Sequence, residues 1–334
     1  MDPVNILVLT DHQTHTAQNS IYELLKSVNA HPDCSSLFVV SRGVSQNKPF
    51  FEDFSSTQLW GTIVKADFGF DPNGIAFTTS LKQVNLKDFA AIILRLPAPV
   101  SNQFWTFLGQ NTAGQILINE PKGILKASSK AFLMDLQSFC PPMEIVEDRL
   151  AIETFLERFP LVLKPFKSYG GKGLIRLQKD KAWVGKTEMS LEAFWDYYDQ
   201  DPQAYLAMQF LKNVDAGDKR IVVIDGEVIG ASCRLPAEGD WLCNTSQGGQ
   251  SVAAKVDADE QRIIDGISQK LREIGIVFYG IDTLVDDLGR RVLSEINVMS
   301  IGGITQIAEQ NPNRRLMERS AQLLLEYILK KRNS

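Results

Sequence analysis

Acidic and amide side chains towards the end of the chain form the pattern with the clearest chemistry. Two apolar runs flank the turn-prone residues 286–289 and predict a pair of antiparallel strands. Glu295 and Asn297 lie two apart on the second strand and share a face, and Asp282 on the first strand can lie opposite them. Such oxygen ligands suit Mg²⁺ and leave positions for phosphate oxygens. The three residues are a candidate metal site; the alternative is a polar strand face wetted by solvent.

A second pattern, at residues 161–177, suits phosphate binding. An apolar strand presents Lys164, and a glycine-rich loop follows it, Ser168-Tyr169-Gly170-Gly171-Lys172-Gly173. Glycines let backbone N–H groups approach phosphates, and lysines neutralise phosphate charge. Lys164 favours this interpretation because a lysine inside an apolar strand needs a partner. The spacing is not that of a Walker A loop, and the alternative is a plain β-turn.

Two further segments could contact a nucleotide. Lys130 lies on a helix predicted over residues 128–139 and could reach the same phosphates, although a lone helical lysine is usually solvated. Gln209 lies on an apolar strand and could read the edge of an adenine, with Met208, Phe210 and Leu211 in apolar contact. The alternative for this segment is a simple buried strand.

Arginines form a third group, suited to carboxylate or phosphate through the guanidinium fork. Asp218 and Arg220 open a predicted hairpin with its turn at residues 225–226, and Arg234 closes it. Plain alternation across this turn puts the two arginines on opposite faces, so a shared site requires a β-bulge or an earlier end to the hairpin. Asn244 follows in a glycine-containing loop that is either a turn or an approach to a substrate.

Composition limits the class of protein. The chain has 334 residues, enough for two or three domains, and 44% of them are hydrophobic. A net charge of −5 argues against a nucleic-acid or anionic-membrane surface, and no apolar run is long enough to span a membrane. The four cysteines lack CxxC spacing and suit thiols in a reducing cytoplasm. We therefore expect a cytoplasmic protein without nucleic-acid or membrane partners.

Strand and helix patterns alternate in the first part of the chain. Apolar runs at residues 4–10, 37–41, 89–96 and 115–119, with a helix at 21–28, predict a small α/β layer with a parallel sheet. Residues 48–80 have an irregular pattern, from which no order of helices and strands is predicted. Later helices are predicted at residues 191–198, 258–274 and 313–331.

Taken in order along the chain, these features resemble the ATP-grasp ligases, bacterial glutathione synthetase above all and the ribosomal-protein glutamate ligases second. The resemblance is dense from about residue 161 to residue 300. Its motifs are Lys164 with the glycine loop, Gly217-Asp218-Lys219-Arg220, Arg234-Leu235-Pro236, Asn244 with Gly248-Gly249, Asp282, and Glu295-Ile296-Asn297.

The resemblance implies a fold and a set of roles. The fold is α/β and α+β multidomain: an N-terminal parallel-sheet (pre-ATP-grasp) domain at 1–120, a linker helix and central lid subdomain at 121–205, and a C-terminal ATP-grasp subdomain with the metal site at 206–334. The resemblance implies that Asp282, Glu295 and Asn297 bind Mg²⁺, or alternatively Mn²⁺. It implies that catalysis is carried out by Arg220, Arg234 and Asn244. The residues implied to bind ATP are Lys130, Lys164, Ser168, Tyr169, Gly170, Gly171, Gln209, Leu211 and Asp218.

The implied reaction joins a carboxylate to an amine through an acyl phosphate made from ATP, with γ-glutamylcysteine and glycine as the leading pair. Small molecules or short peptides are the expected substrates, and a homo-oligomer is compatible with the family. Three departures bear on this: Leu242 and Gln250 stand where the family usually has arginines, and the segment from Arg95 to Pro99 is less basic. The alternatives are a nucleotide-binding regulator without turnover, a ligase of another pair, or a small-molecule kinase.

Overall fold

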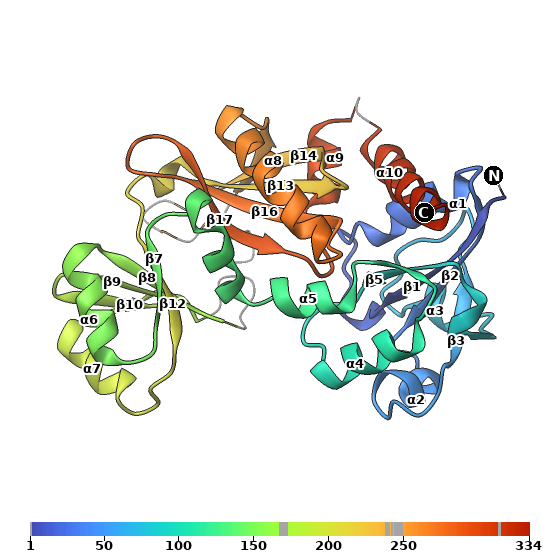
Figure 1. The fold of residues 1–334 in the computed structure, drawn as a ribbon, viewed down its shortest axis with the longest axis horizontal. Helices are drawn as coiled ribbons and strands as arrows, with labels where there is room; N and C mark the ends of the chain where they lie inside the picture. The colour runs from blue at the N-terminus through green and yellow to red at the C-terminus, as the bar shows by residue number, and fades with distance from the viewer. Residues whose placement is uncertain (1, 167–172, 238–240, 242, 244–249, 313–314) are drawn as a thin grey trace.

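Three β-sheets organise the chain, each with its own helices (Figure 1). The computed structural model describes residues 2–166, 173–237, 241, 243, 250–312 and 315–334. The α/β and α+β character expected from the sequence is confirmed, since one sheet is mostly parallel and the other two are antiparallel.

The N-terminal sheet has the order β4-β3-β2-β1-β5-β6. Four of its strands are parallel, as predicted: β1 (Val4–Thr10), β2 (Cys34–Ser41), β5 (Ala91–Arg95) and β6 (Ile116–Ile118). Two short antiparallel strands extend it, β3 (Gln58–Ile63) and the edge strand β4 (Lys82–Asn85). Residues 48–80, for which no order of elements was predicted, therefore supply β3. Its helices are α1 (Ile21–Ala30), α2 (Lys48–Phe51), α3 (Ile75–Thr78) and α4 (Asn102–Asn111), with 3-10 turns η1 (His12–Thr14), η2 (Ser45–Asn47) and η3 (Leu86–Asp88).

The middle sheet is antiparallel, with the order β11-β10-β9-β8-β12-β7. Its strands are β7 (Met143–Val146), β8 (Leu161–Pro165), β9 (Ile175–Gln178), β10 (Lys181–Val184), β11 (Thr187–Ser190) and β12 (Tyr205–Gln209). Helices α6 (Arg149–Arg158) and α7 (Leu191–Tyr198) pack on one face, against Leu161 and Leu163. Strand alternation therefore turns Val162 and Lys164 to the other face.

The C-terminal sheet is also antiparallel, with the order β15-β14-β13-β16-β17. Its strands are β13 (Asp218–Ile224), β14 (Glu227–Leu235), β15 (Gln250–Ala254), β16 (Phe278–Val285) and β17 (Arg291–Asn297), with the 3-10 turn η5 (Val214–Ala216) before β13. The predicted turn between β13 and β14 is confirmed: Asp225 and Gly226 have φ of 48° and 86°. Helices α8 (Ala258–Glu273), α9 (Ile304–Gln310) and α10 (Leu316–Arg332) complete this part.

The connection between the first two sheets differs from its prediction. The helix expected over residues 128–139 is a 3-10 helix, η4 (Lys130–Phe139), with a kink at Leu136. The α-helix lies just before it, α5 (Pro121–Ala127), and begins with a proline whose fixed φ suits a first helical turn. The middle sheet continues past residue 205 through β12, and the division of the chain at residues 120 and 205 stays a prediction.

The N-terminal sheet is fastened to the C-terminal one at several points. Helix α10 lies beside α1 in one apolar cluster (Figure 1). Asn119 is buried, and its Nδ2 donates to the carbonyls of Phe278 (2.6 Å) and Val298 (3.0 Å). Arg95, also buried, donates to the carbonyl of Ile301 (3.1 Å). These contacts place the ends of β16 and β17 against the parallel sheet.

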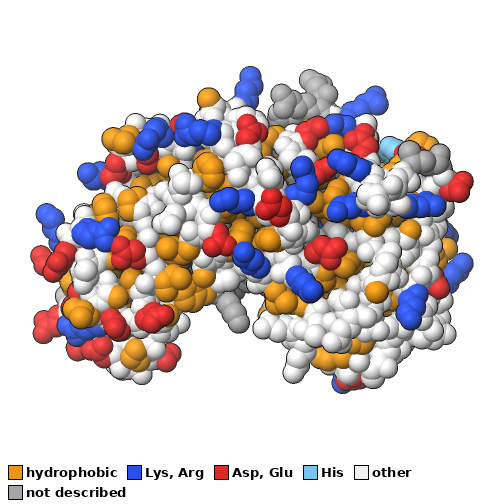
Figure 2. Space-filling view, viewed as in Figure 1, with side chains coloured by type: hydrophobic (Ala, Val, Ile, Leu, Met, Phe, Trp, Pro, Cys, Tyr) orange, Lys and Arg blue, Asp and Glu red, His pale blue; other side chains and the backbone are white. Residues whose placement is uncertain are grey.

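The surface carries charges of both signs. On the face shown in Figure 2, lysine, arginine, aspartate and glutamate side chains are interspersed. No helix in the described part of the chain is both long enough and apolar enough to cross a bilayer.

Candidate functional site

One pocket, between the middle and C-terminal sheets, collects six of the predicted site residues. It encloses about 840 Å³ of empty space, part of it open to solvent, within the range of small-molecule sites. The predicted residues that line it are Lys130, Lys164, Gln209, Leu211, Asp218 and Glu295. The rest of the lining is largely apolar: Val162, Leu174, Met208, Phe210, Val214, Trp241, Cys243, Leu284 and Ser294.

Two buried lysines lie at one side of this pocket. Lys164 Nζ donates to the carbonyl and to Oγ of Ser294, each at 3.1 Å, and Lys130 Nζ lies 3.9 Å from Glu295 Oε1. Burial lowers the pKa of both lysines, and the nearby Glu295 opposes this shift. Two lysines held in a largely apolar pocket are candidate partners for an anion, since an anion would favour their charged form.

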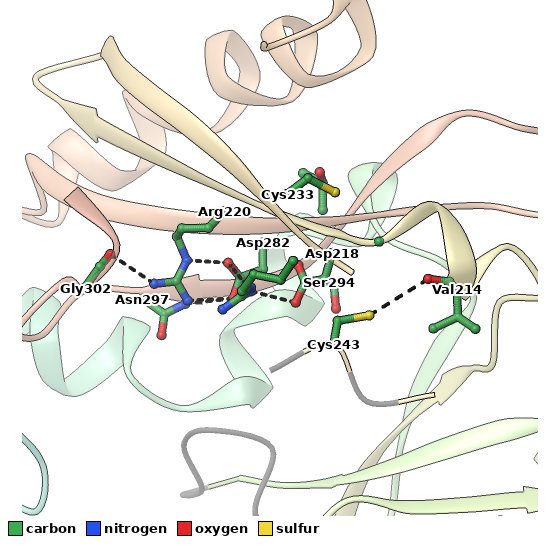
Figure 3. Close-up of polar contacts among 12 residues, drawn as sticks. Val214, Asp218, Arg220, Cys233, Cys243, Asp282, Ser294, Asn297 and Gly302 are labelled. Carbon is green, nitrogen blue, oxygen red and sulfur yellow. Dashed lines mark hydrogen bonds and ion pairs between the residues drawn. The ribbon is translucent and has the colours of Figure 1, made fainter. Parts of the chain in front are cut away.

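A β-bulge brings the two arginines together. Arg220 pairs with Ser232, and the register shifts between Val222 and Val223, so Arg234 faces the same side as Arg220. The condition set by the sequence pattern for a shared site is therefore met. Arg220 and Arg234 both form ion pairs with Asp282, and Figure 3 shows the cluster around that carboxylate.

The charges in this cluster shift one another. Although burial alone would raise it, the two arginines hold the pKa of Asp282 well below its usual range. Asp218 behaves differently: burial, and then the charge of Asp282, raise its pKa to about 7 despite a 2.6 Å ion pair with Arg234. Among the described residues, nothing donates a hydrogen bond to the buried Asp218 Oδ1. A buried acceptor that lacks a donor is a candidate ligand contact.

The predicted metal ligands lie side by side. Asp282 pairs directly with Glu295 across β16 and β17, and Asn297 pairs with Gly280 two positions away. Two carboxylates and an amide suit a hard divalent cation, so the donor set fits such an ion. Within the described residues no three His, Cys, Asp or Glu side chains form a group that could hold a metal ion.

Asp282 is already fully engaged. Its two oxygens accept two hydrogen bonds from Arg220, one contact from Arg234 at 3.0 Å and one hydrogen bond from Asn297 Nδ2 at 3.3 Å. A carboxylate offers about four acceptor positions. Binding of an ion by Asp282 would therefore exchange at least one of these partners, whereas Glu295 lies outside this arginine cluster.

Several predicted residues fall outside the described part of the chain. These are Asn244 and Leu242, and the loop residues Ser168, Tyr169, Gly170 and Gly171. Gln250 is described: it opens β15 opposite Leu235 and is exposed.

An aromatic group lies at the pocket, and of its members only Phe210 was predicted, as an apolar contact for adenine. The Arg176 guanidinium lies over the rings of Phe210 (3.9 Å) and Trp183 (4.5 Å), and Phe210 meets Trp241 edge-on at 6.1 Å. These residues come from separate segments with no shared spacing, so only the fold reveals the group. Such an arrangement stiffens Phe210 and supplies a flat apolar surface.

Comparisons with known proteins show what the chain is similar to. The family model described as prokaryotic glutathione synthetase, ATP-grasp domain, matches residues 129–312, more than half of the chain. The glutathione synthetase of Rhodopseudomonas palustris is 32% identical over 231 residues, 68% of this chain and 70% of that protein. That of Brucella melitensis is 31% identical over 228 residues, 67% of this chain and 69% of that protein.

Solved structures share the fold across the whole chain. D-cycloserine synthetase DcsG has a TM-score of 0.66 at 16% identity, covering 97% of this chain and 99% of its own. The D-alanine–D-alanine ligase from Bacillus anthracis complexed with ATP has a TM-score of 0.56 at 10% identity, covering 99% of both chains. The fold is therefore the ATP-grasp fold. The chain belongs to the prokaryotic glutathione synthetase family of ATP-dependent carboxylate–amine ligases.

Proposed function

We propose that this protein activates a carboxylate with ATP to an acyl phosphate, which an amine then attacks to form an amide, ADP and phosphate. The observation that carries the proposal is the single pocket in which two buried lysines and Glu295 meet a mostly apolar wall, next to the arginine cluster around Asp282. In this proposal the lysines bind phosphate, the apolar wall binds the adenine base, and both lie beside the candidate metal site.

In this proposal the charged and polar side chains of the site bind the phosphates, the divalent ion and the substrate carboxylate. Lys130 and Lys164 bind phosphate oxygens, and Asp282, Glu295 and Asn297 hold a divalent ion, proposed to be Mg²⁺ with Mn²⁺ as the alternative. When bound, such an ion neutralises charge that develops on the transferred phosphoryl group. Arg220 and Arg234, on one face of the hairpin, orient the carboxylate and stabilise the acyl phosphate. Asn244 is proposed to act beside them.

The proposed substrates are γ-glutamylcysteine and glycine. The family membership supports this pair, while Gln250 and Leu242 at positions usually held by arginine favour a less anionic substrate. Among small molecules and short peptides, another amino acid or peptide pair is therefore the second candidate. The regulator without turnover is not favoured, because the chain belongs to a family of ligases.

The test follows ADP release with ATP, Mg²⁺ and a panel of carboxylates and amines that includes γ-glutamylcysteine with glycine. We expect ADP and a new amide in equal amounts, identified by mass spectrometry. Glu295→Gln should remove most of the activity, because it takes one ligand charge from the metal site. A stable phosphate ester would instead indicate a kinase, and no ADP with any pair in a broad panel would refute the proposal.

We also propose a cytoplasmic location. All four cysteines are free thiols, which supports this proposal because thiols stay reduced in the cytoplasm. A homo-oligomer remains a proposal. Sedimentation of the purified protein at micromolar concentration tests it directly, and a monomer mass would exclude it.

A further inference from the structure

The segment that joins the middle sheet to the C-terminal sheet forms part of the pocket wall. Strand β12 ends at Gln209, and Gln209, Phe210 and Leu211 all line the pocket. Gln209 and Leu211 also line a second cavity, on the other side of this segment, which includes Asp287. Gln209 therefore lies between the pocket and the turn that joins β16 to β17.

Asp286 orders that turn. Its Oδ1 accepts the backbone N–H groups of Leu288 (2.9 Å) and Arg290 (2.8 Å), and its Oδ2 accepts from the Arg290 guanidinium at 2.8 Å. Its carbonyl accepts from Asn213 Nδ2 at 2.6 Å, which ties the turn to the connecting segment. The next residue, Asp287, is thereby held against the same segment.

The carboxylate of Asp287 makes two contacts there. Oδ1 accepts the backbone N–H of Lys212 at 2.9 Å, and Oδ2 accepts from Gln209 Nε2 at 3.3 Å. A carboxylate only accepts hydrogen bonds, so the Gln209 amide must turn its NH₂ group towards Asp287. Its carbonyl oxygen Oε1 is then directed away from Asp287.

We propose that Asp287 is a positioning residue that gives the nucleotide site its preference for adenine. By holding the NH₂ group of Gln209, it leaves Oε1 as an acceptor for the exocyclic amino group of the base. Adenine carries a donor at that position, whereas guanine carries a carbonyl oxygen. The inference rests on the proposed function in one respect, that Gln209 faces the base of the bound nucleotide.

The test compares kcat/KM for ATP and for GTP in three variants. In Asp287→Ala the amide is no longer held, and we expect the ATP-to-GTP ratio to fall about three- to tenfold, the effect of one hydrogen bond. Asp287→Asn should lower the ratio further. The side-chain oxygen of the introduced asparagine still accepts the Lys212 N–H, so its NH₂ group faces Gln209. The Gln209 carbonyl then turns towards that NH₂ group, and the NH₂ group of Gln209 faces the base.

The third variant is Gln209→Ala, in which Asp287→Asn should have no further effect on the ratio. Asp215→Asn is the matched control, because Asp215 is an exposed carboxylate on the same connection and its loss should leave the ratio unchanged. A purely structural role for Asp287 would raise KM for both nucleotides equally, and an unchanged ratio in Asp287→Asn would overturn the inference. Wild-type protein that releases no ADP would count against the proposed function, and direct ATP and GTP binding would then still test Asp287.

Discussion

Replacement of Lys164 by methionine separates nucleotide binding from folding. The Lys164 ammonium is buried and donates to Ser294 alone among the hydrogen bonds described, at 3.1 Å to each of two oxygens. Burial lowers its pKa, so the folded protein holds this charge at a cost that methionine, of similar length, does not carry. Removal of the buried charge stabilises the folded protein, whereas loss of the two hydrogen bonds destabilises it by about 1 kcal/mol each. We expect the free energy of unfolding to change by about 1 kcal/mol or less.

ATP binding should change far more. A hydrogen bond from an ammonium to a phosphate oxygen contributes about 2 kcal/mol, which corresponds to a roughly thirtyfold weaker binding of ATP. Lys181→Met is the matched control, because Lys181 is an exposed lysine at the far side of the same sheet. Calorimetric titration with ATP and Mg²⁺ measures both variants.

The pH dependence gives a second measurement on the same variant. Phosphate favours the charged lysine, so ATP binding takes up a proton once the pH exceeds the lowered pKa of Lys164 in the nucleotide-free protein. Affinity of the wild type should therefore fall at alkaline pH, and that of Lys164→Met should not fall for this reason. ATP affinity equal to the wild type in Lys164→Met would refute the assignment of this lysine.

Two predictions concern stability. The pKa of Asp218 is raised from 3.8 to about 7 in the folded protein, so the stability that its protonation contributes is present at acidic pH and is lost as the pH rises through about 7. The free energy of unfolding in urea should therefore fall between pH 3.8 and about 7 in the wild type, and Asp218→Asn should lack this slope. Equal slopes in the two proteins would contradict the shift. Asn119→Asp should destabilise the protein by about 3 kcal/mol or more, because a carboxylate cannot donate to the carbonyls of Phe278 and Val298. Asn102→Asp, at the exposed start of α4, is its control, and similar effects of the two changes would sink the argument.

Elements with a strong local signal were predictable from the sequence. Strand β1 and helix α7 have the predicted bounds, because an unbroken apolar run and a capped amphipathic segment each determine their own limits. The Asp-Gly turn at residues 225–226 identified the hairpin, and alternation from it showed that a shared site for the two arginines required a bulge or an earlier end to the hairpin. The bulge lies between the pairs of Val222 and Val223, and this position was not visible in the sequence.

Other parts depend on contacts between distant segments. Strand β4 is a short edge strand and β3 lies beside it, both with little apolar pattern. The segment of η4 forms a 3-10 helix in place of the α-helix that its composition favours. The aromatic wall at Phe210 and Trp241 forms only when two segments meet. Family motifs identified the polar residues of the pocket, whereas the contacts of Asp287 required the fold.

A crystal structure with Mn²⁺ and a non-hydrolysable ATP analogue tests the central claim most directly. Anomalous scattering locates the ion independently of the nucleotide. The account predicts an ion bound by oxygens of Asp282, Glu295 and Asn297 at about 2.0–2.3 Å, with the triphosphate beside Lys130 and Lys164. An ion elsewhere, or a nucleotide outside the pocket between the two sheets, would contradict it.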